Sequence, residues 1–181
     1  EENRKRKMPG GRADPQALRA AVETALQAKF GGSRWVAYAG ESGIYLNLQD
    51  RANPAEAETV AANAARAFPN VARVYTATQL ANGQVSGDGL GGSLRDGFSP
   101  GRSGNVLLVL NPYWIFAATG ATHGTPYGYD THVPMLFLGA RIKPGRYNAN
   151  AAPSDIAATL ATILDIETPS GSVGCFSLMR L

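Results

Sequence analysis

Cysteine and histidine are scarce in this 181-residue chain, which has one cysteine, Cys175, and two histidines. A single cysteine excludes an internal disulfide and a cysteine-rich zinc site, and we interpret Cys175 as a small apolar packing residue. No apolar run reaches the roughly 18 to 20 residues of a membrane-spanning helix, because the longest, 106–115, is interrupted by Asn111 and Pro112. These absences exclude a disulfide scaffold and a membrane-spanning segment.

An excess of charge of one sign is also missing beyond the first residues. Residues 1–12 hold five of the 17 basic and two of the 14 acidic residues, which accounts for the whole formal net charge of +3. The remainder is neutral and has no basic stripe, which excludes a nucleic-acid-binding face. The basic run 4–7 has two interpretations, a targeting signal or a solvated linker, and charge runs in general favour the linker.

The length corresponds to one domain at roughly 150 residues per domain, and an apolar content of 44% is typical of a globular chain. The sequence does not start with methionine and shows no apolar signal core. We therefore expect a piece of a longer protein, in which residues 1–13 are a polar linker.

Helix and strand signals alternate in the first half. Asp14-Pro15 precedes an apolar stripe that ends at Gly31-Gly32, the pattern of a capped helix. The predicted elements are a helix over 15–30, strands over 35–39 and 44–48, a helix over 54–68 and a strand over 71–76. This order predicts a small split βαβ (ferredoxin-like) subdomain over residues 14–80.

Glycine and then aliphatic residues dominate the second half. Eight glycines fall within 81–104, which predicts a functional or mobile loop without regular structure. The runs 106–110 and 133–138 are apolar throughout, as in strands covered on both faces, and a helix is predicted from Pro153 onward. Residues 105–181 are therefore predicted to belong to a larger α/β sheet.

Both histidines lie within one short segment, at His123 and His132. A neutral imidazole is a common metal ligand, and the neighbouring glycines let the backbone pass close to a site. The alternative is that both side chains only form hydrogen bonds in a loop before a strand. Spacing alone favours this alternative.

A longer motif points to a family. The segment 122–139, which begins Thr122-His123-Gly124, resembles the last metal-ligand segment of the alkaline phosphatase superfamily. It is most similar to the branch of type I phosphodiesterase/nucleotide pyrophosphatase enzymes and related bacterial alkaline phosphatases. The similarity is strong over 99–169 and weaker over 34–80. It implies an α/β fold: the C-terminal part of an alkaline-phosphatase-like α/β sandwich that carries the split βαβ subdomain.

The resemblance also implies an activity. In this family two zinc ions hold a phosphoryl group while a threonine or serine attacks phosphorus, and the position of His123 supplies one zinc ligand. The family's other ligands, an early Asp, an Asp-x-x-x-His pair and an Asp-His pair, have no match here, nor has its nucleophile. We therefore expect a fragment of a zinc-dependent phosphomonoesterase or phosphodiesterase that is inactive alone. The alternative is a non-catalytic binding or scaffold module. By resemblance, the expected location is periplasmic or otherwise outside the cytoplasm.

Two further side chains have open roles. His132 either orients the ligand loop from outside the metal or forms a structural hydrogen bond, and the structural role is favoured. Arg102 either contacts a phosphate or braces its own loop, and bracing is favoured. Because an unpaired strand edge promotes pairing between chains, the isolated chain is expected to form a homodimer through an exposed sheet edge in its second half.

Overall fold

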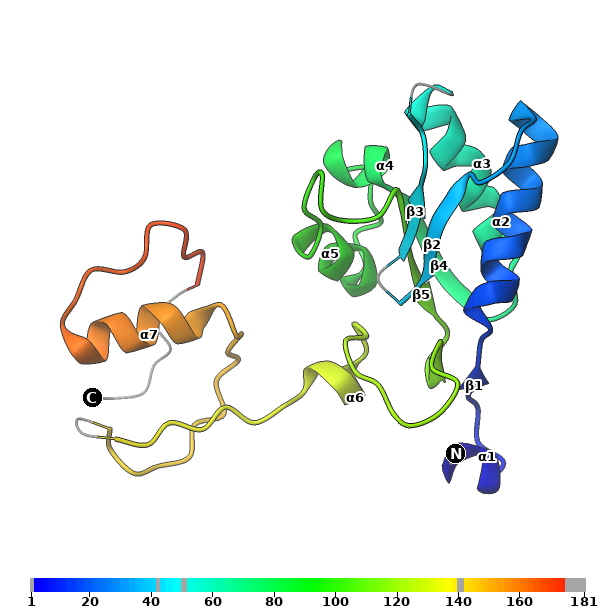
Figure 1. Cartoon of the computed structure of the whole chain (residues 1–181). Coiled ribbons are helices and arrows are strands. Elements are labelled where there is room, and N and C mark those ends of the chain that lie inside the picture. Colours follow the sequence, from blue (N-terminus) through cyan, green and yellow to red (C-terminus); the bar gives the residue numbers. More distant parts are fainter. Residues whose placement is uncertain (1, 42, 50–51, 140–141, 175–181) are drawn as a thin grey trace. The chain divides into compact units, whose positions relative to one another are not determined.

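A computed structural model describes residues 2–41, 43–49, 52–139 and 142–174 (Figure 1). Cys175 lies outside the described residues. The chain divides into two compact units, Glu1–His132 and Val133–Leu181, each with its own architecture. No helix in the described part of the chain is long and apolar enough to cross a bilayer.

A four-stranded antiparallel sheet forms the centre of the first unit. Its order is β2-β3-β5-β4. The strands are β2 (Val36–Gly40), β3 (Gly43–Leu46), β4 (Val71–Thr76) and β5 (Val106–Leu110). Figure 1 shows α2 (Pro15–Phe30) and α3 (Pro54–Ala67) on one face of the sheet, with α4 (Ala77–Ala81) and α5 (Gly89–Asp96) on the other.

Local sequence signals set the two long helices. The side chain of Asp14 accepts a hydrogen bond from Gln16 N, and Pro15 occupies the first helical turn of α2. Asn53 caps α3 in the same way, with Pro54 following it. A side-chain cap satisfies an amide that the helix itself leaves without a partner, and proline fixes a helical φ at that position. The predicted order α-β-β-α-β is confirmed for residues 14–80.

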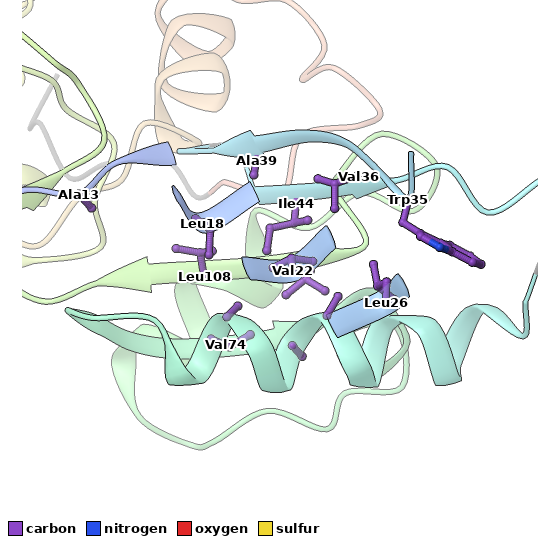
Figure 2. Close-up of a cluster of buried hydrophobic side chains, with 14 of the residues drawn as sticks. Ala13, Leu18, Val22, Leu26, Trp35, Val36, Ala39, Ile44, Val74 and Leu108 are labelled. Carbon is purple, nitrogen blue, oxygen red and sulfur yellow. The ribbon is translucent and has the colours of Figure 1, made fainter. Parts of the chain in front are cut away.

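The core lies between these two helices and the sheet (Figure 2). Leu18, Val22 and Leu26 project from α2 at helical spacing and are fully buried. Alanines line the facing side of α3, and small residues let two helices pack closely. Trp35 and Ile44 close the core at the sheet, with 2% and 0% of their surfaces exposed.

The strand at 106–110 differs from the sequence prediction, which assigned it to the C-terminal segment. β5 lies between β3 and β4 in the sheet of the first unit. The predicted subdomain boundary between residues 104 and 105 would therefore separate β5 from the strands with which it pairs. The side chains of β5 are buried almost throughout, as the continuous apolar pattern indicated. The pattern shows that a strand is covered, but it does not show which strands pair with it.

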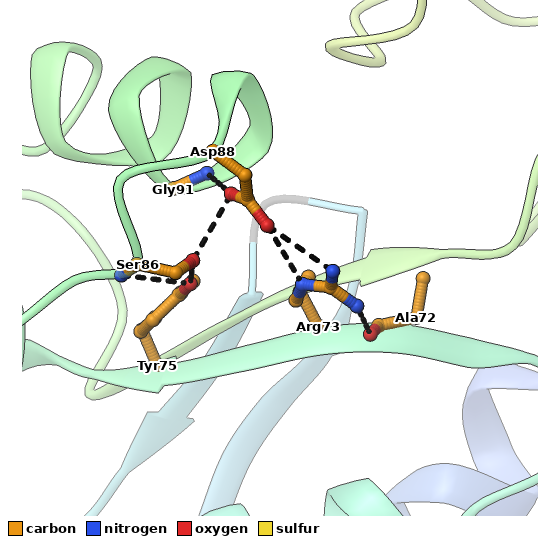
Figure 3. Close-up of polar contacts among 6 residues, drawn as sticks. All are labelled: Ala72, Arg73, Tyr75, Ser86, Asp88 and Gly91. Atoms are coloured by element: carbon orange, nitrogen blue, oxygen red, sulfur yellow. Dashed lines mark hydrogen bonds and ion pairs between the residues drawn. The ribbon is translucent and has the colours of Figure 1, made fainter.

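The glycine-rich stretch 81–104 also differs from its prediction, because it contains the helix α5. Asp88 caps this helix by accepting a hydrogen bond from Gly91 N at 2.8 Å (Figure 3). The other carboxylate oxygen of Asp88 accepts from the guanidinium of Arg73 on β4 at 3.1 Å, and Tyr75 bonds to Ser86. The Asp88 pKa is lowered, mainly by the Gly91 amide and then by Ser86 and Arg73. A polar network thus fixes a segment that has few large apolar residues.

The predicted linker 1–13 is partly folded. A short helix, α1, covers Glu2–Lys5, and β1 (Gly11–Arg12) pairs in parallel with β6 (Trp114–Ile115). Ala13 is 8% exposed and belongs to the core. A polar composition therefore did not prevent backbone pairing with a distant segment.

Within its described residues, the second unit contains one helix, α7 (Asp155–Leu164), as expected from Pro153. The predicted strand 133–138 is absent, and Leu136 and Leu138 are 90% and 102% exposed. A strand exists only through hydrogen bonds to a neighbour, and no described residue pairs with this run. The second half therefore shows exposed apolar side chains in place of the expected sheet edge.

Candidate functional site

His123 lies on a loop that leaves the sheet after β5. The chain turns at Tyr113, whose φ of 66° is in the left-handed region, and then forms β6. After Phe116, which is buried, the loop runs to α6 (Gly128–Thr131), a single helical turn. We call residues 117–127 the His123 loop.

Arg12 binds the near side of this loop. Its Nη1 donates to the carbonyl of Ala117 at 2.5 Å, and its Nη2 donates to the carbonyl of Gly120 at 2.9 Å. Gly120 has a φ of 72°, a conformation that glycine adopts without steric cost. One guanidinium therefore holds both ends of the turn that precedes His123.

Glu41 and Asp130 bind the residues on either side of His123. The Thr122 hydroxyl donates to Glu41 Oε2, at the tip of the β2–β3 hairpin, at 3.1 Å. Thr125 N donates to Asp130 Oδ2 at 2.6 Å. This amide is the main cause of a lowered Asp130 pKa, and the charge of His123 adds a smaller effect in the same direction. The carboxylate form of Asp130 is thus the one that holds the loop.

Tyrosines attach the far side of the loop to the sheet. The Tyr127 hydroxyl donates to the carbonyl of Leu110, at the end of β5, at 2.7 Å, and burial raises the pKa of Tyr127. Tyr129 stacks between Tyr127 and Tyr113, with ring centroids 5.6 and 4.6 Å away, and its hydroxyl accepts from Tyr113 N at 3.0 Å. The loop is thereby held at both ends.

The imidazole of His123 itself is exposed and bonds to no described residue. In its neutral form an exposed imidazole of this kind can bind a metal. No group of three histidine, cysteine, aspartate or glutamate side chains that could hold a metal occurs in the described part of the chain. Since a catalytic zinc site normally takes three protein ligands, the described residues do not form a complete site by themselves.

The two residues with open roles lie at the surface. His132 is exposed, and its backbone N–H donates to the carbonyl of Gly128 at 3.0 Å. This hydrogen bond is structural, but it comes from the backbone and not from the imidazole. Arg102 lines an open cavity of about 440 Å³ together with Glu41 and Ser99. Its loop is closed by backbone and serine bonds, such as Ser103 N to Ser99 O at 2.9 Å, and no hydrogen bond joins its guanidinium to a described residue of the loop.

Sequence reasoning identified His123 but missed the residues that hold its loop. Arg12 lies in the predicted linker, 105 residues before its partner Ala117, and no local pattern connects the two. Asp130 is different, because its five-residue separation from Thr125 is a local turn signal that could have been read.

Comparison with known proteins identifies the family. No family model matches the chain. A Myroides odoratus protein named calcium-transporting ATPase is 33% identical over 171 residues, 91% of this chain and 31% of that protein. Alkaline phosphatase PhoK of a Sphingomonas species is 31% identical over 172 residues, 88% of this chain and 30% of PhoK. The crystal structure of alkaline phosphatase PafA matches 95% of this chain and 34% of PafA, with a TM-score of 0.82 and 25% identity.

These matches confirm the predicted α/β fold and the resemblance on which it rested. The chain spans about a third of the length of the proteins that it matches over most of its own length. This chain belongs to the alkaline phosphatase superfamily.

Proposed function

We propose that the whole protein is a zinc-dependent phosphoester hydrolase and that His123 is one of its zinc ligands. The observation that supports this most directly is the His123 loop, which is bound on both sides by side chains while the imidazole is exposed and forms no hydrogen bond with a described residue. The similarity to alkaline phosphatases over nearly the whole chain supports the same proposal. The substrate is then a phosphate monoester or diester.

The contribution of this chain is to present an imidazole at a fixed position. When bound, zinc ions would polarise the phosphoryl oxygens and stabilise charge on the departing oxygen. The remaining ligands and the attacking threonine or serine would come from the rest of the protein, because one ligand of a three-ligand site does not hold zinc tightly. The chain alone is therefore expected to be inactive.

Paired histidine variants of the whole protein test this proposal. Zinc content is measured by mass spectrometry, and turnover with p-nitrophenyl phosphate and bis(p-nitrophenyl) phosphate separates monoester from diester hydrolysis. His123→Ala should lower bound zinc and reduce turnover by more than the about 10- to 100-fold that is typical of losing a residue that only orients a metal ligand. His132→Ala is the matched control, because it removes an exposed imidazole nine residues away, and it should leave both quantities near wild type.

Two results would contradict the proposal. Equal zinc content in wild type and His123→Ala would remove His123 from the ligand set. Absence of both turnover and bound zinc in the whole protein would favour a non-catalytic binding module instead. An extracytoplasmic location is also proposed, on family resemblance, and cell fractionation of the whole protein with an antibody tests it.

A further inference from the structure

We propose that Arg12 is a positioning residue for His123: its guanidinium fixes the turn 117–120 and so sets where the imidazole lies. This inference rests on the proposed function of His123. It concerns a residue in a segment that sequence composition had identified only as a linker. The observation is that two nitrogens of one side chain donate to two carbonyls of the His123 loop, at 2.5 and 2.9 Å.

The loop has little else to hold it before His123. Among the described residues, no backbone–backbone hydrogen bond involves residues 117–124. β6, which pairs with β1, ends at Ile115, and beyond the buried Phe116 the first loop side chain that forms a hydrogen bond is Thr122, with Glu41. Arg12 therefore provides the attachment between the β1–β6 pair and the residue next to His123.

Arginine suits this contact better than lysine. Its planar guanidinium presents five N–H donors in a rigid fork, so that one group can bind two carbonyls at once. A lysine ammonium is a single point of contact on a flexible stem. β1 fixes the position of the Arg12 backbone, because Arg12 is in register with Ile115 on β6. The position of the Arg12 backbone and the fork geometry of its guanidinium therefore do not depend on a bound metal.

The alternative is that Arg12 only adds stability to the first unit. Arg19 allows the two roles to be separated. Its Nε and Nη2 donate to the carbonyl of Val36 at 3.3 and 2.9 Å, so it is also an arginine bound to backbone oxygen in this unit. None of its recorded hydrogen bonds involves the His123 loop. Arg19→Ala is therefore the matched control for Arg12→Ala.

The experiment uses the whole protein and two measurements. The zinc dissociation constant is measured by competition with a chelator. Limited cleavage of the metal-free protein by subtilisin, with cut sites located by mass spectrometry, reports the mobility of the His123 loop without any activity assay. Arg12→Ala should raise the zinc dissociation constant about 10- to 100-fold, the range for residues that orient a ligand. It should also speed cleavage within residues 117–124, while Arg19→Ala changes neither quantity there.

Arg12→Lys keeps the charge and provides a second variant if Arg12→Ala does not fold. The logarithm of its zinc dissociation constant should lie closer to that of Arg12→Ala than to that of wild type. The reason is that one ammonium group cannot bind both carbonyls as the guanidinium does. Wild-type zinc affinity and cleavage in both Arg12 variants would overturn the inference, as would equal effects in Arg19→Ala. A wild-type protein that binds no zinc would instead overturn the proposed function, and cleavage alone would then decide whether Arg12 fixes the loop.

Discussion

Replacement of Glu23 by glutamine should destabilise the first unit, because this carboxylate joins α2 to the start of β2. Glu23 Oε2 accepts from Val36 N at 2.8 Å, and Oε1 accepts from Trp35 N at 3.1 Å. Gln27 donates a third hydrogen bond to Oε1 at 3.0 Å. A glutamine at this position keeps one oxygen acceptor but turns an NH₂ group toward the second backbone amide.

The size of the effect follows from these contacts. Removing a hydrogen bond to a charged group costs about 1.5 to 3 kcal/mol, and partial exposure of the carboxylate weakens this through solvent screening. We therefore expect Glu23→Gln to lower the free energy of unfolding by about 1.5 kcal/mol at pH 7. Domains of this size are stable by only about 5 to 15 kcal/mol, so the change is measurable.

The effect should depend on pH. Burial of Glu23 raises its pKa and is the largest single influence, but hydrogen bonds from Val36, Trp35 and Gln27 together lower the pKa below its ordinary value of 4.5. The unfolded state then binds more protons than the folded state between the two pKa values, so stability rises with pH in that window. The difference between wild type and Glu23→Gln is thus full above the unfolded pKa and decreases as pH falls through the folded pKa.

Urea unfolding followed by tryptophan fluorescence measures this difference, since both Trp35 and Trp114 belong to the first unit. Glu56→Gln is the matched control, because Glu56 bonds to Lys29 at 3.2 Å with both side chains about half exposed. Surface pairs of this kind contribute about 0.2 to 1 kcal/mol. Equal losses in the two variants, or a Glu23→Gln loss that is the same at every pH, would refute the argument.

Two further predictions concern α5 and the second unit. Asp88→Ala should lower the protection of the Gly91 amide, meaning its exchange rate relative to the intrinsic rate at the same pH, because the cap that accepts this N–H is lost. Acidification of the wild type through the lowered Asp88 pKa should lower the same protection. Amide exchange by NMR checks it, and Asp96→Ala, at the other end of α5, should leave Gly91 unchanged. The isolated chain should self-associate through apolar side chains such as Leu136, which water penalises at roughly 25 cal/mol per Å². Sedimentation at micromolar concentration should show a dimer that Leu136→Glu weakens, and a wild-type monomer of 19.0 kDa would contradict this.

Much of the first unit could be predicted from sequence because its signals are local. Asp14 with Pro15 and Asn53 with Pro54 mark the starts of α2 and α3 within two residues each. Side-chain capping and a fixed proline φ act on the adjacent backbone, so the sequence itself carries the information. The segment 122–139, together with further motifs over 99–169, likewise pointed to the family without any knowledge of contacts.

The tertiary structure decided what depends on partners far away in the chain. Two runs of similar apolar character behave differently: 106–110 lies between two strands of the sheet, whereas 133–138 forms no strand and exposes Leu136. Arg12 binds Ala117 across 105 residues, although its neighbours resemble a linker. A run of apolar residues determines that a strand can be buried, but backbone hydrogen bonds need a specific neighbour, and only the folded chain determines which neighbour is present.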